Sequence, residues 1–218
     1  IVDAMAAAAT AHAEAFARLA VEETGYGVVA DKIQKNLFSS EKVYAFIRPM
    51  KTVGVIARHE DRRVVEIAEP FGVVAAVVPS TNPTSTAIYK ILISLKARCS
   101  VVLSPHPAAV KCITRVAEVM EEAARRAGAP VGSINWMTTV TLEGTQELMR
   151  HRDVAVILAT GGMGLVRAAY SAGKPAYGVG PGNAPAFIER TADVKKAVRD
   201  VMTGKTFDNG VLCSSENS

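Results

Sequence analysis

The feature that most constrains the fold of this 218-residue chain is a continuous apolar run at residues 71–78, together with the alternation that follows it. A strand without polar positions is typical of a parallel sheet covered by helices on both faces. Downstream, short apolar segments alternate with longer segments of helical periodicity. The predicted strands are 71–78, 100–103, 133–137, 154–159, 176–179 and 184–188, and the predicted helices are 84–96, 108–127, 142–150, 164–171 and 193–202. This order predicts an α/β fold with a doubly wound, Rossmann-like parallel sheet.

The first 70 residues follow another pattern. Apolar side chains at helical spacing predict a helix over 2–20, and the glycines at 24–27 end it. Residues 28–47 predict a second helix, whose charged residues (Asp31, Lys32, Lys35, Glu41 and Lys42) are interpreted as its polar surface. Two strand-like segments at 52–57 and 63–68, joined by a charged turn, predict a β hairpin.

Composition argues against membrane and nucleic-acid partners. The chain is 49% hydrophobic and 21% charged, as soluble globular proteins are. No apolar run reaches the roughly 18 residues that span a bilayer. The N-terminus lacks the pattern of a signal peptide, and because it begins with Ile1 rather than Met we expect residues upstream. The net charge of +4 is spread among acidic residues, which predicts solvated helix faces rather than a nucleic-acid interface.

The cysteines indicate a reducing environment. Cys99, Cys112 and Cys213 are odd in number and lack CxxC spacing. This pattern argues against a disulfide framework and a structural zinc site, and it predicts a cytoplasmic protein. No HxxxH motif or carboxylate cluster predicts another metal site.

Polar residues follow the first two predicted strands of the sheet, where open α/β sheets bind ligands. Asn82 lies in Pro79-Ser80-Thr81-Asn82-Pro83-Thr84 at a helix entrance, and its amide could donate to a developing oxyanion. From this segment alone, an N-cap ahead of Pro83 is the better explanation of Asn82. Ser104 and His106 end the next strand, where they could hydrogen-bond ribose hydroxyls or a 2′-phosphate. A solvent-exposed turn histidine is an equal alternative.

Two glycine-rich segments follow later strands. Thr160, Gly161 and Gly162 form a turn before a helix, where backbone N–H groups can meet a phosphate, although a tight turn needs the same residues. Residues 178–183, which include Gly178 and Gly180, predict a backbone-lined loop that is either a ligand floor or a strained turn.

Cys213 follows a small-residue, glycine-containing approach in Asp208-Asn209-Gly210-Val211-Leu212-Cys213. A thiolate in such an open backbone is a candidate nucleophile for a substrate carbonyl. An ordinary half-buried cysteine is the alternative reading of this residue alone. The upstream Asn82 and glycine turns favour the nucleophile.

Taken in order, these segments resemble the aldehyde dehydrogenase superfamily. The closest resemblance is to its CoA-acylating branch, which includes acylating acetaldehyde and sulfoacetaldehyde dehydrogenases and the aldehyde half of bifunctional aldehyde–alcohol dehydrogenases. The matching segments are residues 79–86, 104–107, 159–162, 173–175, 178–183 and 205–216. The resemblance covers the first half of such an enzyme, so we expect most of the C-terminal catalytic domain to be absent. It implies N-terminal helices and a hairpin over 1–70 that pack on the core or mediate oligomers, a dinucleotide-binding domain over 71–204, and the nucleophile loop over 205–218.

The resemblance also implies residue roles. Cys213 would attack the aldehyde, and Asn82 with the Cys213 backbone N–H would stabilise the oxyanion. The dinucleotide, NAD or NADP, would contact Thr81, Ser104, His106, Thr160, Gly161, Gly162, Gly178 and Gly180. The hydrolytic branch has a glutamate, which activates water, at the position of Gly178. Its absence favours coenzyme A as the acyl acceptor, since a positioned base contributes on the order of 10²- to 10⁴-fold.

The expected reaction is therefore aldehyde, CoA and NAD(P)⁺ to acyl-CoA and NAD(P)H by a homo-oligomer. Two alternatives stay open at this point: a non-catalytic dinucleotide-binding or assembly fragment, and a hydrolytic aldehyde dehydrogenase. The sequence names neither the aldehyde nor the preferred dinucleotide.

Overall fold

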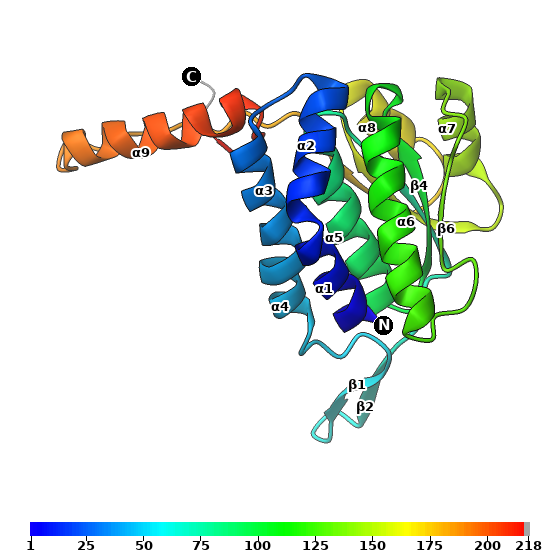
Figure 1. Cartoon of the computed structure of the whole chain (residues 1–218). Coiled ribbons are helices and arrows are strands. Elements are labelled where there is room, and N and C mark those ends of the chain that lie inside the picture. The colour runs from blue at the N-terminus through cyan, green and yellow to red at the C-terminus, as the bar shows by residue number, and fades with distance from the viewer. Residues whose placement is uncertain (216–218) are drawn as a thin grey trace.

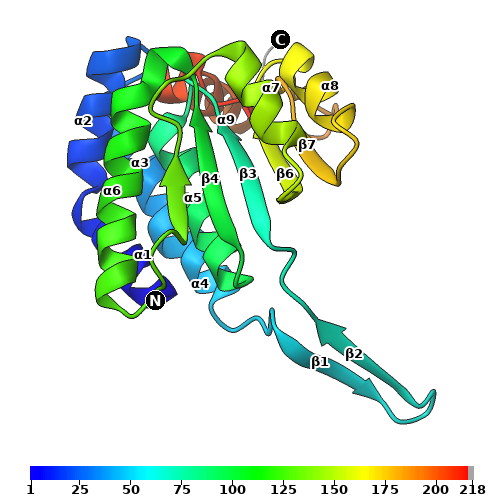
Figure 2. The same cartoon turned by 90° about the vertical axis from the view of Figure 1, so that its right-hand side faces the viewer.

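A computed structural model describes residues 1–215 of the chain, and residues 216–218 lie outside it. The last three residues of the predicted 205–218 segment, including Glu216 of the resembling motif, therefore lie outside the described part. The described chain is α/β, with a five-stranded sheet, helices on its two faces and a separate hairpin (Figures 1 and 2).

The five-stranded sheet is parallel throughout and has the order β5-β4-β3-β6-β7, which confirms the predicted doubly wound sheet. The chain starts at the central β3, winds outward through β4 and β5, and then returns to the other side of β3. The switch point therefore lies between β3 and β6. The strands are β3 (Val73–Val78), β4 (Ser100–Pro105), β5 (Ile134–Trp136), β6 (Val154–Thr160) and β7 (Ala176–Val179).

Alternate side chains of β3 feed two hydrophobic layers, as expected for the apolar run. Val74, Ala76 and Val78 join one core, and Ala75 and Val77 join the other. On the first face lie α5 (Pro83–Lys96) and α6 (Val110–Arg126), preceded by a 3₁₀ turn (Pro107–Ala109). On the second face lie α7 (Leu142–Arg150) and α8 (Met163–Tyr170) (Figure 2).

The N-terminal helices share the first core instead of forming one of their own. Met5 and Phe16 are buried in it with residues of α5 and α6. The helix predicted over 2–20 is two helices, α1 (Val2–Ala11) and α2 (Ala13–Thr24). They meet at His12, whose backbone leaves helical geometry (φ −104°, ψ 7°) and whose ring nitrogen contacts the Ala8 carbonyl. A side chain that competes for a helix carbonyl explains the break.

The second predicted helix forms as one rod with three segments. They are α3 (Val29–Leu37), a π-helical turn (Phe38–Val43) and α4 (Tyr44–Ile47). The apolar periodicity did not reveal the π-helical turn. Such turns occur frequently at functional sites, and this one borders a cavity described below.

The predicted hairpin is present as β1 (Gly54–His59) and β2 (Val64–Ala68), which pair antiparallel in a sheet of their own. It extends away from the rest of the molecule (Figure 2). Val55, Ile56, Val65 and Ile67 are exposed on it. Isolated two-stranded hairpins are marginally stable in water, so such an apolar ribbon is suited to a partner surface.

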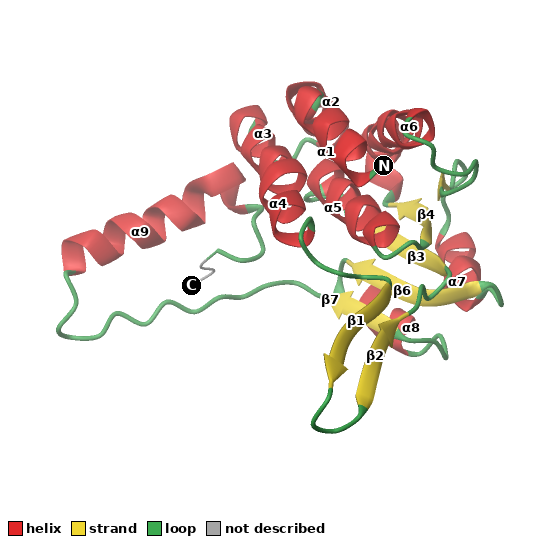
Figure 3. Cartoon of the chain, turned by 90° about the horizontal axis from the view of Figure 1, so that it is seen from below, coloured by secondary structure: helices red, strands yellow, loops and turns green. Residues whose placement is uncertain are grey.

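The last segments of the chain depart from the prediction. The strand predicted over 184–188 is wrong: only Ala184 forms an isolated bridge, and Phe187 is 90% exposed. The segment is part of neither of the two sheets formed by the described residues. Helix α9 (Val194–Thr206) then stands apart from the sheet and buries no residue (Figures 1 and 3). No helix in the described part of the chain is long and apolar enough to cross a membrane.

Candidate active site

A cavity of about 620 Å³ lies at the carboxyl ends of β3, β4 and β6. It occupies the edge where parallel strands of an open sheet bind ligands. Eight of the ten predicted site residues line it, namely Thr81, Asn82, His106, Thr160, Gly161, Gly162, Gly180 and Cys213. The fold thus brings together segments separated by more than half the chain.

Ser104 is near this cavity without lining it. Its side chain is fully buried, and its hydroxyl shares a 2.8 Å hydrogen bond with the hydroxyl of Thr145. Thr145 itself lines the cavity. Ser104 therefore lies behind the cavity wall, where it is hydrogen-bonded to Thr145. Its predicted contact with a ribose stays a prediction.

His106 is held by its own backbone turn. Its Nδ1 accepts a 3.1 Å hydrogen bond from the Ala108 N–H at the start of the 3₁₀ turn. An accepting Nδ1 in a neutral ring places the proton on Nε2. His106 can therefore offer one N–H donor to a ligand in the cavity.

In the glycine turn before α8, the Gly161 N–H is hydrogen-bonded, whereas no other atoms lie over Gly162. The Gly161 N–H donates to the Val179 carbonyl at 3.1 Å, which fixes the turn against β7. Gly162 is the N-cap residue of α8, and a Cβ there would meet no heavy atom within 4 Å. The helix N-terminus is therefore open at Gly162, whereas the Leu165 side chain lies over Gly161, where a Cβ would be 2.6 Å from Leu165 Cδ2.

Gly178 faces away from this cavity and into the second helical layer. A Cβ at Gly178 would lie 2.7 Å from Val166 Cγ1 and 2.9 Å from Tyr170 Cε2. The Gly178 N–H donates to the Tyr170 hydroxyl at 3.1 Å. Gly178 is thus required by packing on α8, and its predicted contact with a dinucleotide stays a prediction.

Asn82 occupies the N-cap position of α5 with Pro83 following, yet its side chain makes no cap hydrogen bond. Its Oδ1 accepts a 2.6 Å hydrogen bond from Lys35 Nζ, and its Nδ2 points to the Val211 carbonyl at 3.5 Å. The capping role considered from the sequence is therefore not the one that the side chain performs. The amide connects α3 to the loop that carries Cys213.

Cys213 is the exposed thiol of the described chain, whereas Cys99 and Cys112 are buried. Burial raises the pKa of Cys112, so its thiol stays protonated and inert. Gly182 lies directly against the Cys213 backbone, because a Cβ there would come within 1.6 Å of the Cys213 carbonyl oxygen. Only glycine allows the 178–183 loop to approach the Cys213 backbone so closely.

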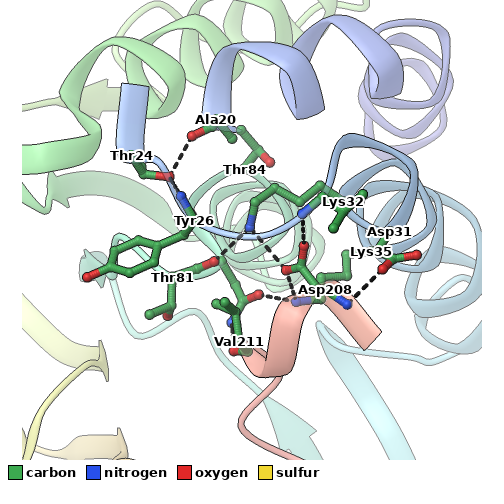
Figure 4. A network of polar contacts seen from close by, with 12 residues as sticks. Ala20, Thr24, Tyr26, Asp31, Lys32, Lys35, Thr81, Thr84, Asp208 and Val211 are labelled. Carbon is green, nitrogen blue, oxygen red and sulfur yellow. Dashed lines mark hydrogen bonds and ion pairs between the residues drawn. The ribbon is translucent and has the colours of Figure 1, made fainter. Parts of the chain in front are cut away.

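A buried ionic network behind Asn82 escaped the sequence analysis. The Asp208 carboxylate is fully buried and accepts hydrogen bonds from the Val28 N–H (2.8 Å), Lys32 Nζ (3.1 Å) and Lys35 Nζ (2.5 Å) (Figure 4). The Asp208 N–H donates to the Asp31 carboxylate at 2.7 Å. Lys32 also donates to the Thr81 carbonyl at 3.0 Å. Helix α3, the Asn82 loop and the Cys213 loop are thereby joined.

The interpretation of Lys32 and Lys35 as polar surface is wrong. Their side chains are 3% and 9% exposed. The i, i+3 spacing of the two lysines was visible, but their partner lies more than 170 residues away. One local signal existed: in Asp208-Asn209-Gly210 all three residues adopt positive φ, which asparagine and aspartate tolerate best after glycine.

Opposing effects act on Lys35. Burial lowers its pKa, whereas the hydrogen bond and charge of Asp208 and the charge of Cys213 act to raise it. Tyr89, deeper in the same region, has a raised pKa, chiefly because it is buried. The charge of Cys213 thus acts on Lys35, which links this lysine to the candidate nucleophile.

A second cavity, of about 610 Å³, opens on the other side of Asn82. The π-helical turn and α5 form its walls, and Asn82 and Leu212 line both cavities. The Asn82 side chain and the loop before Cys213 therefore stand between two spaces, each large enough for part of a ligand.

The whole chain is similar to one family of known proteins. Residues 1–218 match a family model described as the aldehyde dehydrogenase family. The bifunctional aldehyde-alcohol dehydrogenase of Escherichia coli (strain K12) is 50% identical over 215 residues, which are 97% of this chain and 24% of that protein.

Solved structures agree in fold over almost the whole chain. An acetylating aldehyde dehydrogenase from Geobacillus thermoglucosidasius has a TM-score of 0.96 and 56% identity, covering 99% of this chain and 48% of that one. A propionaldehyde dehydrogenase from Rhodopseudomonas palustris, with bound CoA and an acylated cysteine, has a TM-score of 0.87 and 31% identity, covering 99% and 49%. The chain spans about half the length of these solved relatives and about a quarter of the bifunctional one.

Proposed function

Since this chain belongs to the aldehyde dehydrogenase family, we propose that it carries the dinucleotide site and the nucleophile of a CoA-acylating aldehyde dehydrogenase. The substrates are a small aldehyde, coenzyme A and NAD⁺ or NADP⁺. The observation that carries this proposal is that Asn82 and Cys213 line one cavity with the glycine turn at the strand ends.

The residues around that cavity fit a dinucleotide. Gly161, Gly162 and Gly180 leave backbone without side chains at its wall, and the N-terminus of α8 supplies N–H groups for a phosphate. His106 adds a donor suited to a ribose hydroxyl. When bound, the dinucleotide accepts the hydride that leaves the substrate carbon.

Cys213 and Asn82 perform the bond-forming steps. The Cys213 thiolate attacks the aldehyde carbon, and the carbonyl electrons move onto oxygen to give a thiohemiacetal oxyanion. Asn82 Nδ2, an N–H donor, stabilises that oxyanion. Loss of hydride from the same carbon leaves a thioester on Sγ. The thiolate of coenzyme A then attacks the thioester carbon, the bond to Sγ breaks, and acyl-CoA departs with the Cys213 thiolate restored.

The environment of Gly178 supports CoA as the acceptor. The resemblance places the glutamate base of the hydrolytic branch at this position. Here Val166 and Tyr170 fill the space that a side chain would need. Water therefore lacks a positioned base at this point, whereas a thiolate nucleophile needs none.

The hairpin is suited to a homo-oligomer, and the cysteines are suited to a reducing compartment. The exposed apolar residues of β1 and β2 would be buried between subunits of a homo-oligomer. Three unpaired thiols fit a reducing compartment such as the cytoplasm.

The test is the absorbance of reduced nicotinamide with acetaldehyde, in the presence and absence of coenzyme A. Turnover only with coenzyme A is expected. Equal rates without it would favour a hydrolytic enzyme. Dinucleotide binding without turnover, across acetaldehyde, longer aliphatic aldehydes and sulfoacetaldehyde, would favour a non-catalytic dinucleotide-binding module.

Two substitutions assign the roles. Cys213→Ala is expected to abolish turnover and to keep dinucleotide binding, measured by fluorescence titration. Asn82→Ala should lower kcat by roughly 10²-fold or more. Because Asn82→Ala also removes the acceptor of the Lys35 ammonium, some loss of thermal stability is expected, and kcat is compared at temperatures where both proteins are folded. Near-normal turnover in Cys213→Ala would remove the assignment.

A further inference from the structure

We propose that Lys35 is a positioning residue, which fixes the orientation of the Asn82 amide so that its N–H₂ end serves the oxyanion formed at Cys213. This inference rests on the proposed function, because it concerns the same oxyanion. It adds a residue of α3 that the nucleophile and oxyanion assignment does not include.

The first step is the chemistry of the two ends of the Asn82 amide. An amide can rotate to exchange its oxygen and nitrogen, and only the nitrogen can donate to an oxyanion. A lysine ammonium donates and cannot accept, so the atom 2.6 Å from Lys35 Nζ must be Oδ1. The Val211 carbonyl only accepts, so the atom 3.5 Å from it must be Nδ2. Both neighbours select one orientation, and the second N–H of Nδ2 is left for a ligand oxygen.

Lys35 exerts most of this selection. A hydrogen bond to a charged group contributes about 1.5–3 kcal/mol, whereas the 3.5 Å contact to Val211 is long for an N–H···O bond. Without Lys35, the amide would be free to turn its oxygen toward the nucleophile. That orientation would repel an oxyanion.

Lys35 is itself held firmly. Its Nζ lies 2.5 Å from Asp208 Oδ2 and 5.6 Å from the centre of the Phe207 ring. Asp208 is fully buried and is anchored a second time by Lys32. Asp208 also lies five residues before Cys213 in the chain. The cation that orients Asn82 is thus fixed to the segment that carries the nucleophile.

Lys32 provides a matched control. It lies one helical turn before Lys35, is equally buried and pairs with the same carboxylate oxygen. Its other hydrogen bond goes to the Thr81 carbonyl and not to the Asn82 side chain. Lys32→Met therefore removes one positive charge from the network without releasing the amide, whereas Lys35→Met does both.

The experiment compares two reactions of Cys213 in each variant of the whole chain. With p-nitrophenyl acetate, the thiolate bonds to the carbonyl carbon to give a tetrahedral oxyanion, which collapses with loss of p-nitrophenolate and leaves S-acetyl-Cys213. With iodoacetamide, the thiolate displaces iodide from a saturated carbon and no oxyanion forms. Intact mass and peptide mapping give both rates at Cys213. Their ratio reports oxyanion stabilisation and cancels changes in the amount of thiolate.

The ratio of the acetylation rate to the alkylation rate is expected to fall about tenfold in Lys35→Met, in line with the loss of a charged hydrogen bond. It stays within about twofold of the parent in Lys32→Met and falls roughly 10²-fold in Asn82→Ala. The double variant Lys35→Met/Asn82→Ala should match Asn82→Ala alone, since both changes remove the same donor. If Lys35→Met does not fold, Lys35→Gln is compared with Lys32→Gln, with a fall of about threefold expected because a neutral donor remains.

The outcomes separate the two proposals. A fall in Asn82→Ala without a fall in Lys35→Met would overturn the role of Lys35 and leave the oxyanion site standing. Equal falls in both lysine variants would also overturn it, because charge alone would explain them. An unchanged ratio in Asn82→Ala, or no acylation of Cys213, would overturn the oxyanion role and this inference together.

Discussion

Lys90 illustrates how far a single side chain can depart from its usual environment. It is 1% exposed on α5, and its Nζ donates to the carbonyls of Val77 (2.6 Å) and Leu158 (2.8 Å). These carbonyls lie near the carboxyl ends of β3 and β6, the two strands at the switch point. Burial lowers the pKa of Lys90 from 10.5 to about 7. One amine thus holds the strand ends together beneath the candidate active site.

This pKa makes stability depend on pH. Between about pH 7 and pH 10.5 the unfolded lysine holds its proton while the folded one has lost it. The unfolded state then binds more protons, so the free energy of unfolding rises with pH in this window. In urea denaturation between pH 7 and pH 10.5, we expect the free energy of unfolding of wild type to rise by up to about a few kcal/mol more than that of Lys90→Met. The exposed Lys195→Met serves as the control, and parallel curves for wild type and Lys90→Met would contradict the assignment.

Some residues of the candidate site were predicted from the sequence, and others were missed. Asn82, Cys213 and the glycines of the two loops were predicted because their neighbours in sequence carry the signal. Lys32, Lys35 and Asp208 were missed because each is defined by a partner far along the chain. Charged residues on an amphipathic helix are usually solvated, and no local pattern reveals that a carboxylate will cover them.

At the scale of elements, the sheet and its helices followed from periodicity because each buries its apolar side chains against a neighbour. Periodicity missed the break at His12, the π-helical turn and the true state of residues 184–188. Residues 184–188 have the apolar composition of a strand, but among the described residues they form only the isolated bridge at Ala184. The hairpin kept its strands because β1 and β2 pair with each other.

Helix α6 shows one element completing another. Glu23 of α2 accepts hydrogen bonds from the N–H groups of Lys111 (2.8 Å) and Cys112 (2.7 Å), in the first turn of α6. These are donors that a helix cannot satisfy internally, and a carboxylate there also favours the helix dipole. Glu23 therefore caps the N-terminus of α6 and also joins α2 to α6.

Removing this cap should weaken the whole first layer. We expect Glu23→Ala to lower the free energy of unfolding by about 1–2 kcal/mol in urea denaturation. Glu22→Ala, a neighbouring exposed glutamate, should change it by less than about 0.5 kcal/mol. Equal effects in the two variants would show that the cap contributes little.

On the scale of the whole molecule, Asp208 connects the two ends of the described chain. It is buried without solvent exposure and contacts Val28, Lys32 and Lys35 of the N-terminal region. A Cβ at Gly27 would lie 2.0 Å from its Oδ1, so the α2–α3 turn must be glycine at this point. The C-terminal segment is thus docked at one buried carboxylate, while α9 before it buries no residue.

Neutralising this carboxylate should be costly. Asp208→Asn leaves two buried ammonium groups without their counter-charge, and such changes cost about 3–5 kcal/mol of unfolding free energy. Asp200→Asn, which breaks an exposed pair with Lys196, should cost less than about 1 kcal/mol. Urea denaturation of both variants measures the difference. A loss as small as that of Asp200→Asn would show that the buried network contributes little to stability.

The docking of Asp208 on α3 also bears on how the protein is made. During synthesis, the two lysines of α3 leave the ribosome long before the aspartate that neutralises them, with more than 170 residues between them. Until that carboxylate emerges, burying both ammonium groups is unfavourable, so α3 cannot settle fully against α2 and α5. The nascent chain therefore completes its N-terminal layer and positions the Cys213 loop in the same late event. A truncated product that stops before residue 208 lacks both the thiol and the means to close that layer.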